Sequence, residues 1–236
     1  MGTASSPADG PAGAHSRAVE DYLKAVFKLQ AVSGQVSTTA LATELSRSAA
    51  SVTNMVKGLA EQGLLVHEPY HGVRLTPQGE STALRIIRRH RVIETYLIER
   101  LGYTWDGVHV EAERLEHAVS DELVDRMARA LGDPDEDPHG APIPSPEGVI
   151  ASRDLVSLSE LRAGVDAVVR EVSDEDSARL RELAAAGFLL GADVVVTDRM
   201  PDGSIVVRVA GSERRIDAVT AGLIQLERGE TKPMGE

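Results

Sequence analysis

The apolar positions near the start of the chain follow the period of a helix. From Ser16 to about Val32 they recur at steps of three and four residues, at Val19, Tyr22, Leu23, Val26 and Phe27, which places them on one helical face. Gly34 then ends the helix. A second helix is predicted over residues 36–45, and a third over residues 48–62 with Ser48 as its N-cap. Residues 16–62 are therefore predicted to form three helices.

The second and third helices form a helix-turn-helix, because only the tight turn Ser46-Arg47 separates them. The third helix is predicted to bury its apolar residues Val52, Met55, Val56 and Leu59. Its other face offers small side chains and one cation, which suit close entry into a DNA major groove. These residues are Ser48, Ala50, Ser51, Thr53, Asn54 and Lys57. An ordinary polar helix face is the alternative interpretation.

A β-hairpin is predicted directly after this pair of helices, with strands over residues 64–68 and 72–76. A helix-turn-helix followed by a hairpin is the pattern of a winged helix, and it is more specific than either part alone. Arg74 and His71, near the tip of the wing, could contact phosphate groups. The pattern therefore favours DNA binding over a generic polar surface.

Three further helices are predicted downstream. The first begins at Thr76-Pro77, a favourable N-cap followed by proline at the first helical position, and runs to Leu101. It carries His90 and Glu94 four residues apart, a spacing that lets two side chains hold one ion, although such a pair is also common on helix surfaces. The others are predicted from about Asp106 to Val119 and from Asp121 to Leu131, the latter with Ser120 as N-cap and Gly132 at its end. Their apolar residues exceed what short helices can bury internally, which indicates a homodimer.

The last part of the chain changes character. Residues 132–146 are rich in proline and acid and are predicted to be an extended, partly stiff linker, in which His139 is interpreted as a turn residue. Short strands are predicted over residues 166–172, 193–197 and 204–209, with a helix over 174–186 and a last strand or turn over 223–226. Together they predict a small β-barrel. This part has no phosphate loop, paired catalytic carboxylates or nucleophile elbow, and we expect no enzyme activity.

Composition narrows the choices further. The chain has 236 residues and no cysteine, which excludes disulfides and thiolate metal sites. Net charge is −12, but residues 1–105 carry 11 basic and 9 acidic side chains, whereas residues 106–236 carry 14 and 28. The first half can therefore meet phosphates. Residues 1–15 are predicted to be a disordered tail. No apolar run is long enough to span a membrane, and we expect a soluble, cytoplasmic protein.

The strongest chemical signal is the segment from His109 to His117. Glu113, Glu116 and His117 stand at i, i+3 and i+4, so on a helix they share one face within a single turn. Carboxylates and imidazole are common ligands of divalent metals. Three such ligands cannot complete a six-coordinate shell, so a metal site here needs donors from elsewhere in the chain. Asp21 considered alone is a solvated carboxylate near a helix N-terminus.

Four motifs together resemble those of the diphtheria-toxin-repressor family of metal-dependent transcription regulators, and of its manganese-sensing branch. They are Glu20-Asp21-Tyr22-Leu23, the third-helix sequence over residues 48–56, the His90-to-Glu94 segment and the run from Glu113 into residues 118–122. The resemblance covers Ser16 to about Pro144. It implies a mainly α protein with a small β domain. Its parts would be a winged helix-turn-helix DNA-binding domain (16–80), a helical metal-binding and dimerisation domain (81–145) and a C-terminal SH3-like β-barrel of the FeoA type (146–236).

The resemblance also implies two metal sites in each subunit. The primary site would use Asp21, Glu113, Glu116 and His117. The second site would use His90, Glu94 and His109, with a ligand from the C-terminal domain at Asp176 or its neighbour Glu175. A further family ligand position falls on Arg179, which cannot bind a metal. Two-domain manganese regulators carry an acidic residue where this chain has Lys24, so their paired-metal arrangement is not expected.

The identity of the primary-site residues favours manganese. Iron-sensing members of the family have methionine and cysteine at the positions of Asp21 and Glu113. Hard oxygen ligands suit Mn²⁺, whereas soft sulfur ligands favour iron and later metals. We therefore expect a repressor that binds double-stranded operator DNA with Mn²⁺ as corepressor and controls manganese uptake genes.

Three alternatives stay open. The first is an Fe²⁺-dependent regulator of the same family that controls iron homeostasis. The second is a helical carboxylate enzyme, although the Glu-x-x-His pair that such enzymes use is broken by Arg114. The third is a winged-helix regulator of an organic ligand, whose DNA binding would survive a chelator.

Overall fold

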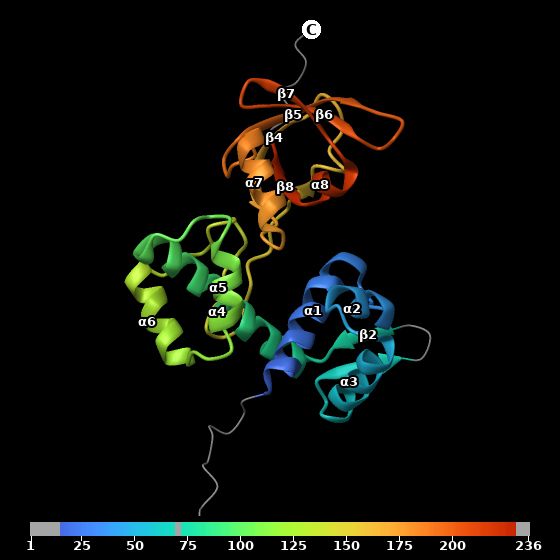
Figure 1. Ribbon diagram of the computed structural model, residues 1–236, viewed down its shortest axis with the longest axis vertical. Coiled ribbons are helices and arrows are strands. Elements are labelled where there is room, and N and C mark those ends of the chain that lie inside the picture. Colours follow the sequence, from blue (N-terminus) through green and yellow to red (C-terminus); the bar gives the residue numbers. More distant parts are fainter. Residues whose placement is uncertain (1–14, 69–71, 230–236) are drawn as a thin grey trace, which may run out of the picture. The chain divides into compact units, whose positions relative to one another are not determined.

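The structure is a computed structural model that describes residues 15–68 and 72–229 (Figure 1). The chain divides into two compact units, and the boundary between Ile86 and Ile87 falls inside one long helix. Of the predicted tail, only His15 lies within the described residues, and His71 of the predicted wing tip lies outside them. None of the described helices is both long and apolar enough to cross a membrane.

The first unit contains the three predicted helices and the hairpin. Their bounds are α1 Arg17–Ser33, α2 Thr38–Glu44, α3 Ala49–Glu61, β1 Leu65–Glu68 and β2 Gly72–Leu75. Ser16, Ser37 and Ser48 cap the helices, and each hydroxyl accepts a hydrogen bond from the backbone N–H three residues on. The strands pair antiparallel. The helix-turn-helix and the wing expected from the sequence are thus both present.

An aliphatic core holds this unit together. Its fully buried side chains come from all three helices and include Leu23, Val26, Leu41, Val52, Val56 and Leu59. Each contributes about 1.5–3 kcal/mol relative to exposure. Gly72 has φ +98°, and a Cβ there would lie 2.6 Å from the carbonyl oxygen of Val36. The wing therefore requires glycine where it approaches the start of α2.

The helical part of the second unit consists of the remainder of α4 with α5 and α6. The bounds are α4 Pro77–Leu101, α5 Val108–Leu115 and α6 Asp121–Leu131. As predicted, Ser120 caps α6 and Gly132 ends it in the left-handed conformation. The prediction for α5 was too long, because Ser120 must be extended to cap α6 and the chain leaves the helix before it. Glu116 follows the last helical residue but keeps a helical backbone.

Side chains from α4 hold the proline-rich linker in place. Arg88 donates a hydrogen bond to the carbonyl oxygen of Pro144 at 2.9 Å, and Arg91 donates to that of Pro142 at 2.5 Å. Gly140 has φ +88°, and a Cβ there would lie 1.9 Å from the carbonyl oxygen of Arg170. The linker therefore packs closely against the C-terminal sheet and is not only a spacer.

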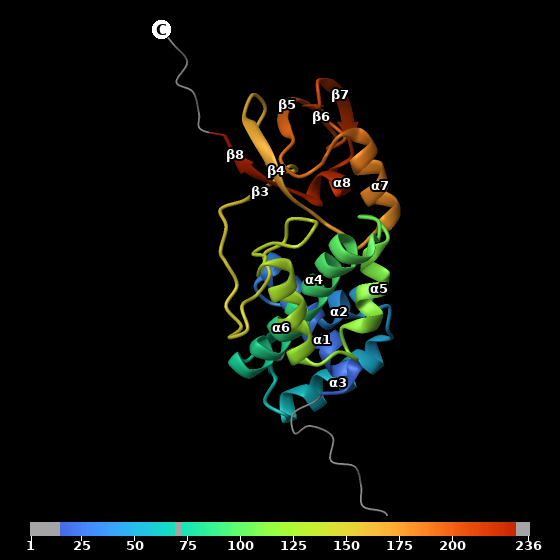
Figure 2. The same ribbon diagram turned by 90° about the vertical axis from the view of Figure 1, so that its left-hand side faces the viewer.

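The C-terminal part of the second unit is an open antiparallel sheet with two helices (Figure 2). The elements are β3 Val156–Ser157, β4 Asp166–Val172, α7 Ser177–Ala186, β5 Asp193–Arg199, β6 Ile205–Val209, β7 Ser212–Ile216, α8 Ala218–Gly222 and β8 Ile224–Arg228. The strand order is β3-β8-β4-β5-β6-β7. The small β domain is present as predicted, but its sheet is open and does not close into a barrel, because the edge strands β3 and β7 do not pair with each other. Strand β7 and helix α8 were not predicted.

Candidate metal centre

Four side chains of metal-binding type gather in the second unit. They are His90 and Glu94 on α4, His109 on α5 and Asp174 after β4, and one donor atom from each lies within 4.8 Å of the others. His90 Nε2 lies 3.0 Å from Glu94 Oε1, and His109 Nδ1 lies 2.9 Å from Asp174 Oδ2. The structure therefore brings together the three second-site residues that the sequence singled out, with a carboxylate from the C-terminal part. We call these four residues the second cluster.

The fourth residue of the second cluster differs from the one expected. Asp176 instead caps α7, where its carboxylate accepts hydrogen bonds from the backbone of Ala178 and Arg179, and its side chain is 53% exposed. Glu175 is exposed as well. The reason is local, because α7 begins at Ser177 and takes the preceding Asp176 as its N-cap. Asp174, two residues earlier, is the one that lies beside His109.

Burial and close ion pairs shape the charges of the second cluster. Burial favours the neutral form of Glu94, but the close rings of His109 and His90 outweigh it and lower the pKa of this carboxyl. Burial likewise opposes the charge of Asp174, yet His109 and His90 hold its pKa well below the usual range. The same contacts, against the effect of burial, raise the pKa of His109 to about 9. The cluster is thus built to hold positive charge between carboxylates.

His139 from the linker also faces the second cluster. Its Nε2 lies 2.8 Å from the carbonyl oxygen of Trp105 and must donate to it, which leaves a lone pair on Nδ1. That Nδ1 is buried, has no hydrogen-bond partner among the described residues, and lies 3.9 Å from Glu94 Oε2. Glu94 is fully buried, and neither of its carboxylate oxygens accepts a hydrogen bond of good geometry from the described residues. Such orphaned acceptors are what a cation site requires.

Asp137 stands beside His139 and was also missed from the sequence. One carboxylate oxygen accepts hydrogen bonds from the backbone of His139 and Ala141, at 2.8 and 3.0 Å. Burial raises the pKa of Asp137 to about 6, although Arg91, with its Nε 3.5 Å away, opposes the shift. Asp137 and His139 form a metal-type group with Glu94. The pair Asp-x-His inside an acidic linker was the available signal.

The predicted primary-site residues are divided between the two units. Glu116 is fully buried, and its Oε1 lies 3.2 Å from His117 Nε2, whose side chain is also mostly buried. Glu113, one turn earlier, is partly exposed. Asp21 belongs to the first unit, near the start of α1, where Arg17 lies 3.8 Å away. Within the second unit, Glu113, Glu116 and His117 offer two carboxylates and one imidazole from a single turn.

The predicted DNA-contacting residues lie on α3 and the wing. Val52, Val56 and Leu59 face the core as predicted, whereas Met55 is only partly buried. The predicted contact residues Ser48, Ala50, Ser51, Asn54 and Lys57 are exposed, and Thr53 is partly exposed. Arg74 is exposed on β2 and pairs with Glu68 at 3.1 Å, a surface pair that phosphate can displace at little cost.

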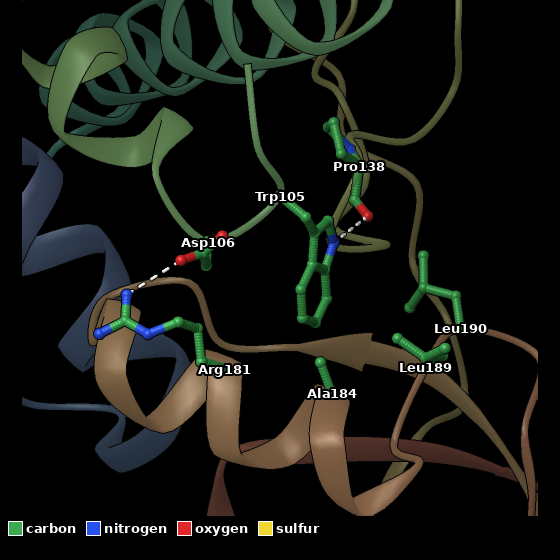
Figure 3. Close-up of a pocket in the computed structure, with 7 residues that line it drawn as sticks. All are labelled: Trp105, Asp106, Pro138, Arg181, Ala184, Leu189 and Leu190. Carbon is green, nitrogen blue, oxygen red and sulfur yellow. Dashed lines mark hydrogen bonds and ion pairs between the residues drawn. The ribbon is translucent and has the colours of Figure 1, made fainter. Parts of the chain in front are cut away.

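A cavity of about 450 Å³ is formed by residues of α7, of the linker and of the segment before α5 (Figure 3). Its lining residues are Trp105, Asp106, Pro138, Arg181, Ala184, Leu189 and Leu190. Trp105 donates from its indole nitrogen to the carbonyl oxygen of Pro138 at 2.9 Å, and its ring centroid lies 5.2 Å from that of His139. Because Trp105 is the only tryptophan of the sequence, its fluorescence should report on the position of His139.

Comparison with known protein families assigns all three parts of the chain. Residues 15–73 match the model described as iron dependent repressor, N-terminal DNA binding domain, and residues 76–145 match iron dependent repressor, metal binding and dimerisation domain. Residues 156–228 match the FeoA domain. The order of the three matches is the order expected from the sequence.

Individual relatives match over most of their length. The iron-dependent repressor IdeR of Mycobacterium tuberculosis is 31% identical over 206 residues, which covers 82% of this chain and 89% of IdeR. The diphtheria toxin repressor of Corynebacterium diphtheriae is 27% identical over 218 residues, which covers 88% of this chain and 96% of the relative. A solved structure described as a manganese-dependent transcriptional repressor complex with manganese is 38% identical, with a TM-score of 0.84 over 89% of this chain and 99% of that one. The structure of the manganese regulator SloR gives 0.78 at 29% identity over 89% of this chain and 98% of that one.

Proposed function

This chain belongs to the diphtheria toxin repressor family of metal-dependent transcriptional repressors, and from that premise we propose that Mn²⁺ is its corepressor and that its targets are manganese uptake genes. The donor chemistry of the proposed primary site carries this proposal. Asp21, Glu113, Glu116 and His117 provide three carboxylates and one imidazole and no sulfur. Oxygen-rich sites suit Mn²⁺, whereas thiolate and thioether ligands shift preference to softer metals.

The second cluster fits a divalent ion on grounds independent of the primary site. It combines buried carboxylates with two imidazoles that already pair with them. His139 adds a buried lone pair aimed at the same carboxylates. We propose that His90, Glu94, His109 and Asp174 form the second site, with His139 within reach as a further donor. Two ions in each subunit follow from this assignment.

In this proposal, one set of residues binds DNA and another set binds the metal. The exposed face of α3, with Asn54 and Lys57, enters the major groove of operator DNA, and Arg74 of the wing meets a phosphate. A bound divalent ion supplies the positive charge that lets several carboxylates converge. Asp21 on α1, by sharing that ion with Glu113 and Glu116, fixes the DNA-binding unit relative to the dimerisation domain. Metal and DNA then favour the same arrangement, so each tightens binding of the other by the same factor.

A symmetric homodimer is part of the proposal. Four large apolar side chains are exposed in the helical part, namely Leu101 (61%), Tyr103 (41%), Val110 (50%) and Leu123 (42%). Burial of such residues between two copies removes apolar surface from water. The dimer would present two α3 helices to half-sites about one turn of DNA apart, ~34 Å. The protein would act in the cytoplasm, where operator DNA is accessible.

An Fe²⁺-dependent repressor is the second candidate, because the relatives that include IdeR are named iron-dependent repressors. The two are separated by selecting a DNA duplex from a random pool under anaerobic conditions, once with Mn²⁺ and once with Fe²⁺. Fluorescence anisotropy of the selected duplex then gives the affinity with each metal and with a chelator. We expect Mn²⁺ to activate operator binding, with selectivity set by coordination number and geometry, because affinity alone ranks Mn²⁺ below Fe²⁺. Activation by Fe²⁺ alone refutes the manganese assignment, and binding that survives the chelator refutes metal dependence altogether.

A further inference from the structure

His90 stands between the two proposed metal sites and contacts both with its single ring. Its Nε2 faces the second cluster, 3.0 Å from Glu94 Oε1 and 3.1 Å from His109 Nδ1. Its Nδ1 lies 2.5 Å from Glu116 Oε2, in the proposed primary site. The His90 side chain is 6% exposed and that of Glu116 is fully buried. One imidazole therefore joins the two clusters with no solvent between its ring and either carboxylate.

We propose that His90 is a positioning residue for the primary site, which it controls through Glu116, and that the two metal sites are coupled through this ring. The inference rests on the proposed function, because it assumes that both clusters hold ions. It adds the residue that carries the coupling. His90, a ligand of the proposed second site, orients Glu116, a ligand of the proposed primary site.

The coupling follows from the two ring nitrogens of histidine. A neutral imidazole carries one hydrogen, and a nitrogen that gives its lone pair to a metal leaves that hydrogen on the other nitrogen. When Nε2 of His90 gives its lone pair to a metal in the second site, Nδ1 must carry the ring hydrogen. Nδ1 can then donate a hydrogen bond to Glu116 Oε2. In the other tautomer, a lone pair on Nδ1 would face the carboxylate at a distance of 2.5 Å, which is repulsive.

This hydrogen bond determines which oxygen of Glu116 is presented to the primary site. With Oε2 held by His90, Oε1 is directed toward His117, whose Nε2 lies 3.2 Å away. The backbone of Glu116 is held as well, because Arg89 donates to its carbonyl oxygen at 3.5 Å. Without the bond from His90, the buried carboxylate would turn to find another donor. A metal bound in the second site should therefore raise the metal affinity of the primary site. A metal bound in the primary site should raise the affinity of the second site by the same factor.

The two nitrogens of His90 can be tested separately. The amide of asparagine can occupy the place of Nδ1, and the longer glutamine can reach the place of Nε2. His90→Asn therefore keeps a donor for Glu116, and His90→Gln removes it, while both lose a second-site ligand. Asp174→Asn is the matched control, since Asp174 forms ion pairs with His90 and His109 but, among the described residues, with no residue of the proposed primary site.

The experiment measures Mn²⁺ binding to the full-length variants by calorimetry, together with thermal unfolding of each metal-free protein. All three variants should lose one ion. The remaining primary site should bind equally well in His90→Asn and Asp174→Asn, and about tenfold more weakly in His90→Gln. Equal primary-site affinity in all three variants overturns the proposal.

A second measurement covers the case in which His90→Gln does not fold. Wild type should bind two Mn²⁺ ions with positive cooperativity, and Asp174→Asn should bind the primary ion more weakly than wild type does. Two independent sites in wild type, with unchanged primary affinity in Asp174→Asn, also overturn the proposal. Glu116→Gln distinguishes this failure from failure of the proposed function. If that substitution leaves Mn²⁺ binding unchanged, the primary site itself is wrongly assigned.

Discussion

The raised pKa of His109 predicts that metal binding at the second site releases a proton. Burial lowers this pKa, but the contact with Asp174 and the nearby carboxylate of Glu94 outweigh burial and raise the pKa to about 9. The ring is therefore protonated at neutral pH in the metal-free protein. A metal ion needs the neutral ring, so the proton has to leave on binding.

The size of the effect follows from the distance between the pKa and the working pH. With a pKa of about 9, about one ring in a hundred is neutral at pH 7, so binding is about 100-fold weaker there than above pH 9. The direction of the pH dependence follows from which state, metal-free or metal-bound, holds the proton. Since the metal-free state holds it, affinity rises with pH, by about tenfold per unit below the pKa, and levels off above it.

The assay isolates the second site in the double variant Glu113→Gln, His117→Asn. Calorimetry with Mn²⁺ at about pH 6, 7 and 8, in two buffers of different ionisation enthalpy, gives both the affinity and the number of protons released. We expect about one proton per ion. Asp174→Asn in the same background removes a second-site ligand and should abolish both the binding and the proton release. An affinity that does not change between about pH 6 and pH 8 would refute the charge arrangement described for this cluster.

Three further predictions concern DNA binding and stability. Lys57→Ala should weaken operator binding and reduce the slope of log affinity against log salt concentration by about 1. Asn54→Ala should relax sequence preference without changing that slope. Fluorescence anisotropy over a salt series measures both effects. Gly140→Ala should displace the linker, because its Cβ would meet the carbonyl oxygen of Arg170 at 1.9 Å; the fluorescence of Trp105 should shift, while Gly148→Ala, where a Cβ meets nothing within 4 Å, serves as control. Phe188→Ala should lower the free energy of unfolding by about 3–5 kcal/mol, since Phe188 is fully buried in the core beside the C-terminal sheet, and a loss below ~1 kcal/mol in denaturant titration would contradict that packing.

Elements with local start and stop signals were predictable from the sequence. The caps Ser48 and Ser120 and the terminal Gly132 act on their own neighbours, so the ends of α3 and α6 could be read directly. Strand β7 could not, because the segment Ser212–Ile216 is mostly charged and forms an edge strand whose pairing depends on its neighbour β6. Closure of the sheet is also a tertiary property, and here the sheet stays open.

The candidate site shows the same division between local and distant causes. The donors on α4 and α5 stood out because their spacing places them on shared helix faces. Asp174 was confused with Asp176, since the sequence does not show which of two nearby aspartates will cap a helix. His139 was interpreted as a turn residue because its environment comes from Glu94 and Trp105, both distant in the chain.

The most direct test of the central claim is operator binding by wild type and by Asp21→Ala, each with and without Mn²⁺. Asp21 lies in the DNA-binding unit, whereas the other proposed primary ligands lie in the second unit. If metal activates the protein by joining them, Mn²⁺ should tighten operator binding by wild type at least about tenfold and leave that of Asp21→Ala unchanged. An equal response of both proteins to Mn²⁺ would contradict the account.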